Sequence, residues 1–215
     1  TPVQQGTDLE QLKAIGERFG HVFFIEPGPA PGINIAYWGP PKRVGVPQRA
    51  LSVNMGPETN VETINFTYNG LAPTIVKDSI QDKDLNVEIP VMTFASTRIP
   101  PLAAMPALPL QLPNVRTTLL DKGDGLSVAQ AYARAQGITD KSVDNVVTAQ
   151  GELDAQRYGG VLKPRGIVGV RGVGFTHDGL YYVKSVSHAI SHGKYKQRFS
   201  LSREGTGAIT PVVIP

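Results

Sequence analysis

The sequence of 215 residues contains no cysteine, which excludes a disulfide framework and any metal site built from thiolates. It has no apolar run approaching the ~18 residues that a membrane-spanning helix needs. No signal peptide with a basic start, an apolar middle and small closing residues opens the chain. Because the chain starts at Thr1-Pro2 without a methionine, we expect it to be a processed or trimmed piece of a longer protein.

Dense runs of positive charge are also missing, although the formal net charge is +3. Recognition of nucleic-acid phosphates normally requires basic side chains gathered on one face. The nearest approach to such a cluster is Lys184, Lys194, Lys196 and Arg198. Their placement on two alternating segments favours a solvated strand face, so we expect no nucleic-acid specificity.

Motifs for cofactors and metal ions are absent. Neither a P-loop nor a dinucleotide fingerprint occurs, and Gly169, Gly172 and Gly174 lie in a predicted strand, where they indicate bulge or twist positions. His188 and His192 stand four residues apart, but on a strand and its turn they do not share a face as they would on a helix. We therefore expect no metal site and no cofactor.

Signals of catalysis are weak. The GxSxG elbow of hydrolases is absent, and the serines of the carboxy-terminal region occupy ordinary strand and turn positions: Ser185, Ser187 and Ser191. Glu152 and Asp154 are close neighbours rather than carboxylates from two segments that face a cleft. We expect them to form a turn and an ion pair with Arg157 or Arg165. The sequence thus predicts a protein that is not an enzyme, with a cell-wall hydrolase component as an alternative.

Glycine and proline are abundant, at 23 and 18 residues, and predict many turns and short strands. The clearest pattern runs from Asp178 to Arg203. Apolar and polar residues alternate there between turns at Asp178-Gly179 and His192-Gly193, which predicts two paired antiparallel strands. A further strand from Ile167 to Val173 extends the pair to a meander.

Two helices are predicted upstream of this meander. The first follows Thr7-Asp8, with Asp8 as the capping residue and Gly20 at its end. The second is Ala-rich, begins at the capping residue Ser127 and stops at Gly137. The remaining alternation predicts strands at residues 21–26, 33–38, 50–55, 62–68, 75–84 and 143–153.

Residues 89–113 carry six prolines, which cannot donate to a strand ladder, and predict an extended crossing or linker between two domains. The domains are expected at residues 1–113 and 114–215. Residues 204–215 have turn chemistry and few anchors, so we expect them to be loosely held.

The segment from Asp124 into the Ala-rich helix resembles the start of a LysM sugar-binding module. That module needs a compact βααβ unit, and its second helix and closing strand are not evident in the sequence. A peptidoglycan-binding module is therefore retained as an alternative function.

Three ordered blocks resemble the late control gene D family of phages, the baseplate hub of contractile tails, which is similar to the hub part of VgrG proteins: Asp8 to Gly28, Gly151 to Gly174 and Asp178 to Gly207. With the segments between them, the resemblance covers nearly the whole chain. One departure is that family members have another tube-like domain before the first helix, which agrees with a trimmed chain.

The resemblance implies a non-enzymatic structural role and a mainly β (α+β) fold, with two β-rich domains, two short helices and a tail-tube-like small β-barrel at the carboxy-terminal end. It implies a homotrimer that adapts a sixfold tail tube to a threefold spike, with the tube and spike proteins as partners. The expected location is the virion baseplate or a related injection particle, assembled in the bacterial cytoplasm.

Two groups of residues are candidates for the assembly surfaces of such a hub. Aromatic stripes of this kind are more often core than interface, and the candidates for core or subunit contact are Tyr181, Tyr182, Val183, Tyr195 and Phe199. Candidates for facing a lumen or a partner are Lys184, Lys196 and Arg198.

Overall fold

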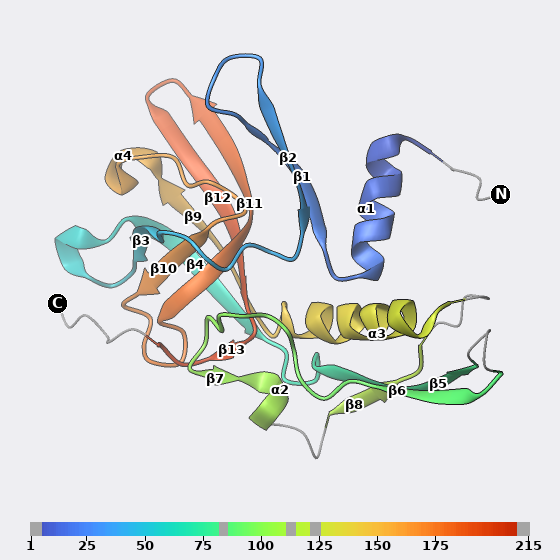
Figure 1. The fold of residues 1–215 in the computed structure, drawn as a ribbon. Coiled ribbons are helices and arrows are strands. Elements are labelled where there is room, and N and C mark those ends of the chain that lie inside the picture. The colour runs from blue at the N-terminus through green and yellow to red at the C-terminus, as the bar shows by residue number, and fades with distance from the viewer. Residues whose placement is uncertain (1–5, 82–85, 111–114, 121–125, 210–215) are drawn as a thin grey trace. The chain divides into compact units, whose positions relative to one another are not determined.

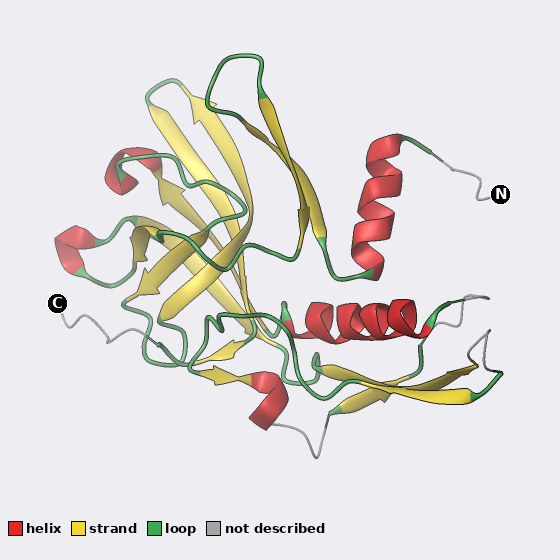
Figure 2. Cartoon of the chain, in the orientation of Figure 1, coloured by secondary structure: helices red, strands yellow, loops and turns green. Residues whose placement is uncertain are grey.

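The computed structural model describes residues 6–81, 86–110, 115–120 and 126–209, and it confirms a β-rich fold of the α+β class (Figures 1 and 2). The chain divides into two compact units. Unit 1 comprises Thr1–Pro41, Thr74–Thr97 and Arg116–Lys141, and unit 2 comprises Lys42–Pro73, Arg98–Val115 and Ser142–Pro215. The predicted boundary between Pro113 and Asn114 falls outside the described residues and stays a prediction.

Unit 1 opens with helix α1 (Asp8–Arg18), followed by the hairpin of β1 (Val22–Pro27) and β2 (Asn34–Gly39). The helix and both strands confirm the predicted elements. The capping residue, however, is Thr7 rather than Asp8. The Thr7 hydroxyl accepts from the Glu10 amide while the Glu10 carboxylate accepts from the Thr7 amide, a reciprocal pair that Asp8 inside the first turn cannot make.

The second part of unit 1 is a small sheet in the order β6-β5-β8, formed by β5 (Thr74–Gln81), β6 (Glu88–Met92) and β8 (Arg116–Thr118). Its apolar residues pack with helix α3 (Val128–Val143) in a core that includes Val76, Val91 and Ala135. The expectation that prolines exclude a ladder from residue 89 onward is wrong at β6, because Pro90 pairs opposite Ser79. β6 is an edge strand, where a residue without an N–H is tolerated.

Helix α3 does not stop at Gly137 as predicted but continues to Val143. Gly137 is instead required by close packing: a Cβ at this position would lie 2.5 Å from the carbonyl carbon of Phe19, in the turn after α1. The predicted strand from Val143 correspondingly begins only at Val147. The glycine therefore marks a helix–backbone contact within unit 1 rather than a helix end.

Replacing Gly137 with alanine is expected to lower the free energy of unfolding by about 1–3 kcal/mol, because backbone atoms must move to admit the methyl group. Helix propensity alone predicts the opposite sign, a gain of up to ~1 kcal/mol. Urea unfolding followed by circular dichroism measures the change. Ala133→Gly, at an exposed position of the same helix, is the control and should cost only the propensity difference. A stabilising Gly137→Ala would contradict the packing shown here.

Unit 2 is built on a six-stranded sheet in the order β3-β10-β11-β12-β9-β4 (Figure 1). Its strands are β3 (Gln48–Ser52), β4 (Val61–Tyr68), β9 (Val147–Asp154), β10 (Ile167–Arg171), β11 (Gly179–Ser191) and β12 (Lys194–Arg203). The consecutive antiparallel pairing of β10, β11 and β12 confirms the predicted meander. Only the β3–β10 pair is parallel, and its register shifts around Gly169, the predicted bulge position.

The two end strands of this sheet are joined through one residue rather than by a ladder. The buried Asn60, which lies between η1 (Gly56–Glu58) and β4, accepts from the Ser52 amide at 2.9 Å and donates to the Ala50 carbonyl at 2.9 Å. The Asn60 amide also donates to the Ser52 carbonyl at 3.1 Å. Asn60 therefore occupies the place of a strand neighbour to β3 and curls the sheet toward closure.

Short elements complete unit 2: β7 (Met105–Pro106), α2 (Ala107–Leu110), α4 (Ala155–Tyr158) and β13 (Gly205–Thr206). α4 occupies the predicted turn at Tyr158 and ends at Gly159, which has a φ of 70°. Gly172 and Gly174, predicted within a strand, instead lie in the turn after β10, both at positive φ.

The tail after Arg203 was expected to be loosely held, and this is wrong for its first residues. Glu204 is buried, and β13 pairs with β7 through Gly205 and Thr206. The last residues of the tail, 210–215, lie outside the described part of the chain. The anchoring comes from a segment far away in sequence, so it has no local signature.

Candidate assembly surface

One face of the unit 2 sheet carries polar side chains in two rows that cross four strands. The strand register aligns the first row as Thr63, Glu152, Arg198 and Ser187. It aligns the second row as Asn65, Gln150, Ser200 and Ser185. These residues line a hollow of about 380 Å³. Two of the three serines considered as catalytic candidates, Ser185 and Ser187, thus belong to a polar sheet face, and Ser191 lies at the hairpin tip.

Ion pairs link the charged members of this face. Lys196 Nζ lies 2.6 Å from Glu62 Oε2 and 2.9 Å from Glu152 Oε1. Arg198 Nε donates to Glu152 Oε2 at 2.7 Å. The expected partners of Glu152 and Asp154, namely Arg157 or Arg165, are therefore replaced. Glu152 binds Lys196 and Arg198 of β12, and Asp154 accepts from backbone amides at the start of α4.

The Arg198 guanidinium, and after it the Lys196 ammonium, hold the pKa of Glu152 below its ordinary 4.5 by hydrogen bonding to the carboxylate. Hydrogen bonding to Glu62, and after it to Glu152, raises the pKa of Lys196, and the hydrogen bond to Glu152 raises the pKa of Arg198. All three side chains are solvated, so the pairs fix orientation more than they stabilise the fold. Their charges are matched within one chain.

We expect the Glu152 carboxyl to titrate below pH 4.5, because a group with a lowered folded pKa stays ionised and paired until the pH falls through that value. The carboxyl carbon shift in a pH-dependent NMR experiment measures this. Arg198→Gln should move the midpoint up toward 4.5, whereas Lys194→Gln at the hairpin tip should not. An unchanged midpoint in Arg198→Gln would show that the ion pair does not form in solution.

The opposite face of the same strands forms the core of unit 2. Of the five residues predicted for core or subunit contact, Tyr181, Tyr182, Val183 and Phe199 are buried within the chain. Tyr195 is half-buried near the hairpin tip, where its hydroxyl lies 3.0 Å from His188 Nδ1. The structure thus separates Tyr195 from the other four candidates.

Arg203 is a fully buried cation surrounded by carbonyl oxygens at the end of β12. Its guanidinium donates to the carbonyls of Thr176, Asp178 and Gly205 at 2.8–2.9 Å. It also lies 4.3 Å above the Tyr181 ring. Burial raises the pKa of Tyr181 to about 12, against the opposing effect of this cation. One side chain therefore joins the turn before β11 to the turn after β12.

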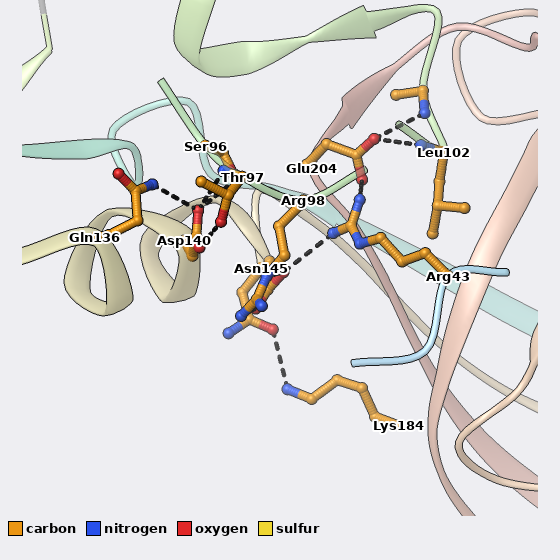
Figure 3. A network of polar contacts seen from close by, with 12 residues as sticks. Arg43, Ser96, Thr97, Arg98, Leu102, Gln136, Asp140, Asn145, Lys184 and Glu204 are labelled. Carbon is orange, nitrogen blue, oxygen red and sulfur yellow. Dashed lines mark hydrogen bonds and ion pairs between the residues drawn. The ribbon is translucent and has the colours of Figure 1, made fainter. Parts of the chain in front are cut away.

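A second buried network joins the three separate segments of unit 2 (Figure 3). Arg43 binds Asp144 at 3.0 Å and Glu204 at 2.6 Å, and Arg98 binds Asp144 at 2.7 Å. Glu204 also accepts from the amides of Leu102 and Ala103. Each segment thus contributes at least one charged group.

Unit 1 has a corresponding polar cluster at its own segment ends. The buried Asp140, near the end of the last unit 1 segment, accepts from Ser96 Oγ at 2.8 Å and from the Thr97 amide at 2.7 Å. Gln136 donates to the same carboxylate (Figure 3). The contacts of Asp140 fix one segment of unit 1 to another.

Strand β11 has an open edge over its outer half. It pairs with β10 only from Gly179 to Tyr182, whereas its pairing with β12 continues to Ser191. Residues 184–191 therefore have β12 on one side and no described strand on the other. This edge carries one charge, Lys184, whose Nζ donates to Asn145 at 3.0 Å, and an isoleucine, Ile190, that is 76% exposed. Edges with so little protection pair readily with another chain.

Within the described ranges, no group of three or more His, Asp or Glu side chains is placed to hold a metal ion. None of the helices described is long and apolar enough to cross a membrane. Helix α3 leads directly into β9, so the second helix of a LysM unit does not follow it, and the Asp124-Gly125 start of the resemblance lies outside the described residues.

Sequence reasoning missed the residues that hold unit 2 together across long separations. Arg43 and Glu204 are 161 positions apart, and Asp144 is 101 positions from Arg43. Asn60 was likewise missed within a loop. A single sequence carries no signal for such pairs, because alternation and turn chemistry report only local structure.

No family model and no curated protein matches the sequence. Solved structures do match its fold. A tail protein from Neisseria meningitidis MC58 superposes with a TM-score of 0.60 at 14% identity, over 95% of this chain and 57% of that one. The 43 kDa tail protein of prophage MuSo2 from Shewanella oneidensis superposes with a TM-score of 0.62 at 12% identity, with the same coverage.

At these identities the likeness establishes a shared fold. The chain has the fold of these phage tail proteins over nearly its whole length and spans a little more than half of theirs.

Proposed function

We propose that the protein is a structural, non-enzymatic subunit of a phage tail or related contractile injection particle. The observation that carries this proposal is the match to two phage tail proteins over 95% of the chain. The finer proposal is a baseplate hub of the late control gene D and VgrG type. In that role the chain assembles as a homotrimer, contacts the tube and spike proteins, and resides in the tail after assembly in the bacterial cytoplasm.

The surfaces of unit 2 support an assembly role. The polar face has its charges paired within the chain, so Lys196 and Arg198 offer a hydrated, nearly neutral surface suited to a lumen. The open edge of β11 offers unpaired backbone groups, which a strand of the next subunit can complete by β-augmentation. Four of the five aromatic and aliphatic candidates are occupied by the core. We therefore assign the subunit contact to the β11 edge, with Tyr195 and Lys184 beside it.

Replacing Ile190 with lysine is expected to weaken self-association at least about tenfold, since the new charge lies on the edge that the next subunit covers. Ile190 is 76% exposed in the single chain, so folding should be unaffected. Sedimentation velocity over a concentration series measures the association. Val46→Lys is the matched control, because Val46 is a 94% exposed apolar residue of the same unit that does not belong to β11. Equal association of the two variants would overturn the assignment of the edge.

A further inference from the structure

A second hollow in unit 2, apart from the polar sheet face, has a composition that points to a ligand. It encloses about 590 Å³ and is lined by Arg49, Gly56, Pro57, Glu58, Thr59 and Arg157. Arg49 belongs to β3, Arg157 to α4, and the other four residues to η1 and its flanks. Three separate segments thus place two guanidinium groups and one carboxylate around one space.

Neither guanidinium has an acceptor among the described residues. This contrasts with the other well-placed arginines of the unit: Arg43, Arg98 and Arg198 bind carboxylates, Arg171 binds the Ser52 hydroxyl, and Arg203 binds carbonyls. Neither Arg49 nor Arg157 forms an ion pair with the Glu58 carboxylate, which lies more than 4 Å from both guanidinium groups. Unmatched guanidinium forks are suited to carboxylates and phosphates.

The backbone holds the Arg49 side chain against α4. Gly159 lacks a Cβ, and one placed there would lie 2.5 Å from Arg49 Nη1. The Tyr158 hydroxyl donates to the Arg49 carbonyl at 2.8 Å, which ties β3 to the same helix. The Arg49 guanidinium therefore lies against the end of α4, the helix that carries Arg157.

The backbone around the hollow is unsuited to a phosphate. Phosphate sites typically aim several free backbone N–H groups at the anion. Here Pro57 has no N–H, and the amides of Glu58 and Thr59 donate to the carbonyls of Met55 and Gly56. The Glu58 carboxylate adds a repulsive charge. Spaced single carboxylates suit this arrangement better than one compact polyanion.

We propose that this hollow binds an acidic segment of a partner protein, with two of its carboxylates on Arg49 and Arg157. That the partner is another tail component rests on the proposed function. The binding itself does not, because it follows from the charges and the space alone.

A labelled, capped peptide of four Glu-Gly repeats tests this proposal by fluorescence anisotropy at low salt, with a Gln-Gly peptide as the neutral comparison. We expect Arg49→Gln and Arg157→Gln each to weaken binding about three- to tenfold, and Glu58→Gln to strengthen it by removing the like charge. Lys194→Gln, which removes an exposed charge at the β11–β12 hairpin tip, is the matched control and should leave binding unchanged.

No binding of the acidic peptide at millimolar concentration, or equal weakening by Lys194→Gln, would overturn the proposal. So would inorganic phosphate displacing the peptide at equimolar concentration, which would identify a small-anion site. Peptide binding by a chain that stays monomeric would leave this site intact and count only against the tail role.

Discussion

Replacement of Arg203 with methionine is expected to lower the free energy of unfolding by about 4 kcal/mol. The methionine fills most of the volume but donates no hydrogen bonds. The carbonyls of Thr176 and Gly207 also accept from backbone amides, so the loss falls on those of Asp178 and Gly205. A buried carbonyl without a donor costs about 1–3 kcal/mol, and the contact with the Tyr181 ring is lost as well.

Unfolding in guanidinium chloride measures this loss of stability. Arg157→Met is the matched control, because Arg157 is exposed and donates to no described group, and its effect should stay within about 0.5 kcal/mol. Arg203→Lys should lie between the two, since an ammonium reaches fewer of the carbonyls. A loss below about 1 kcal/mol in Arg203→Met would show that water replaces the guanidinium and that the site is not sealed.

The second large effect is expected at Glu204. Its change to glutamine should cost about 3–5 kcal/mol. The buried Arg43 guanidinium then keeps only one of its two carboxylate partners, Asp144. The amide oxygen can still accept from Leu102 and Ala103, so the effect isolates the charge. Glu58→Gln, an exposed carboxylate without an ion pair, is the control and should cost little.

A double-mutant cycle with Arg43→Met separates this pair from its surroundings. We expect a coupling energy of at least about 1 kcal/mol, since each single change takes one partner from the other buried charge, whereas the double change removes both charges. Additive losses would mean that Arg43 and Glu204 do not interact in solution, and that Glu204 acts only through the two amides.

The sequence predicted the parts of the fold that local patterns govern. Alternation between the turns at Asp178-Gly179 and His192-Gly193 correctly placed β11 and β12, and apolar spacing correctly placed α1. Where two local signals competed, the prediction of Asp8 was wrong: Thr7 and Asp8 are both good capping residues, but only Thr7 forms the reciprocal pair with Glu10.

Two further errors share one physical cause, which is contact with distant residues. Gly137 is typical of a helix end by propensity, yet it sits inside α3 because Phe19 packs on it. The residues after Arg203 have the composition of a loose tail, yet Glu204 is held by Arg43. Propensity and turn chemistry contain no term for such contacts.

Local patterns predict which side chains share a face of the sheet, and the role of Lys196 and Arg198 toward a lumen or a partner stays a prediction. The alternation of β12 correctly put Lys196 and Arg198 on one face, but it could not reveal that Glu62 and Glu152 neutralise them there. Nor could it show that β11 extends beyond its pairing with β10 and leaves an open edge, since the length of a ladder depends on the neighbouring strand as well.

We propose that this chain is an assembly part whose β11 edge is completed by copies of itself. Multi-angle light scattering of the purified chain over a concentration series tests it most directly. We expect a particle of three times the 23.1 kDa mass of one chain at high concentration. A mass that stays at 23.1 kDa at the highest concentration reached would contradict it.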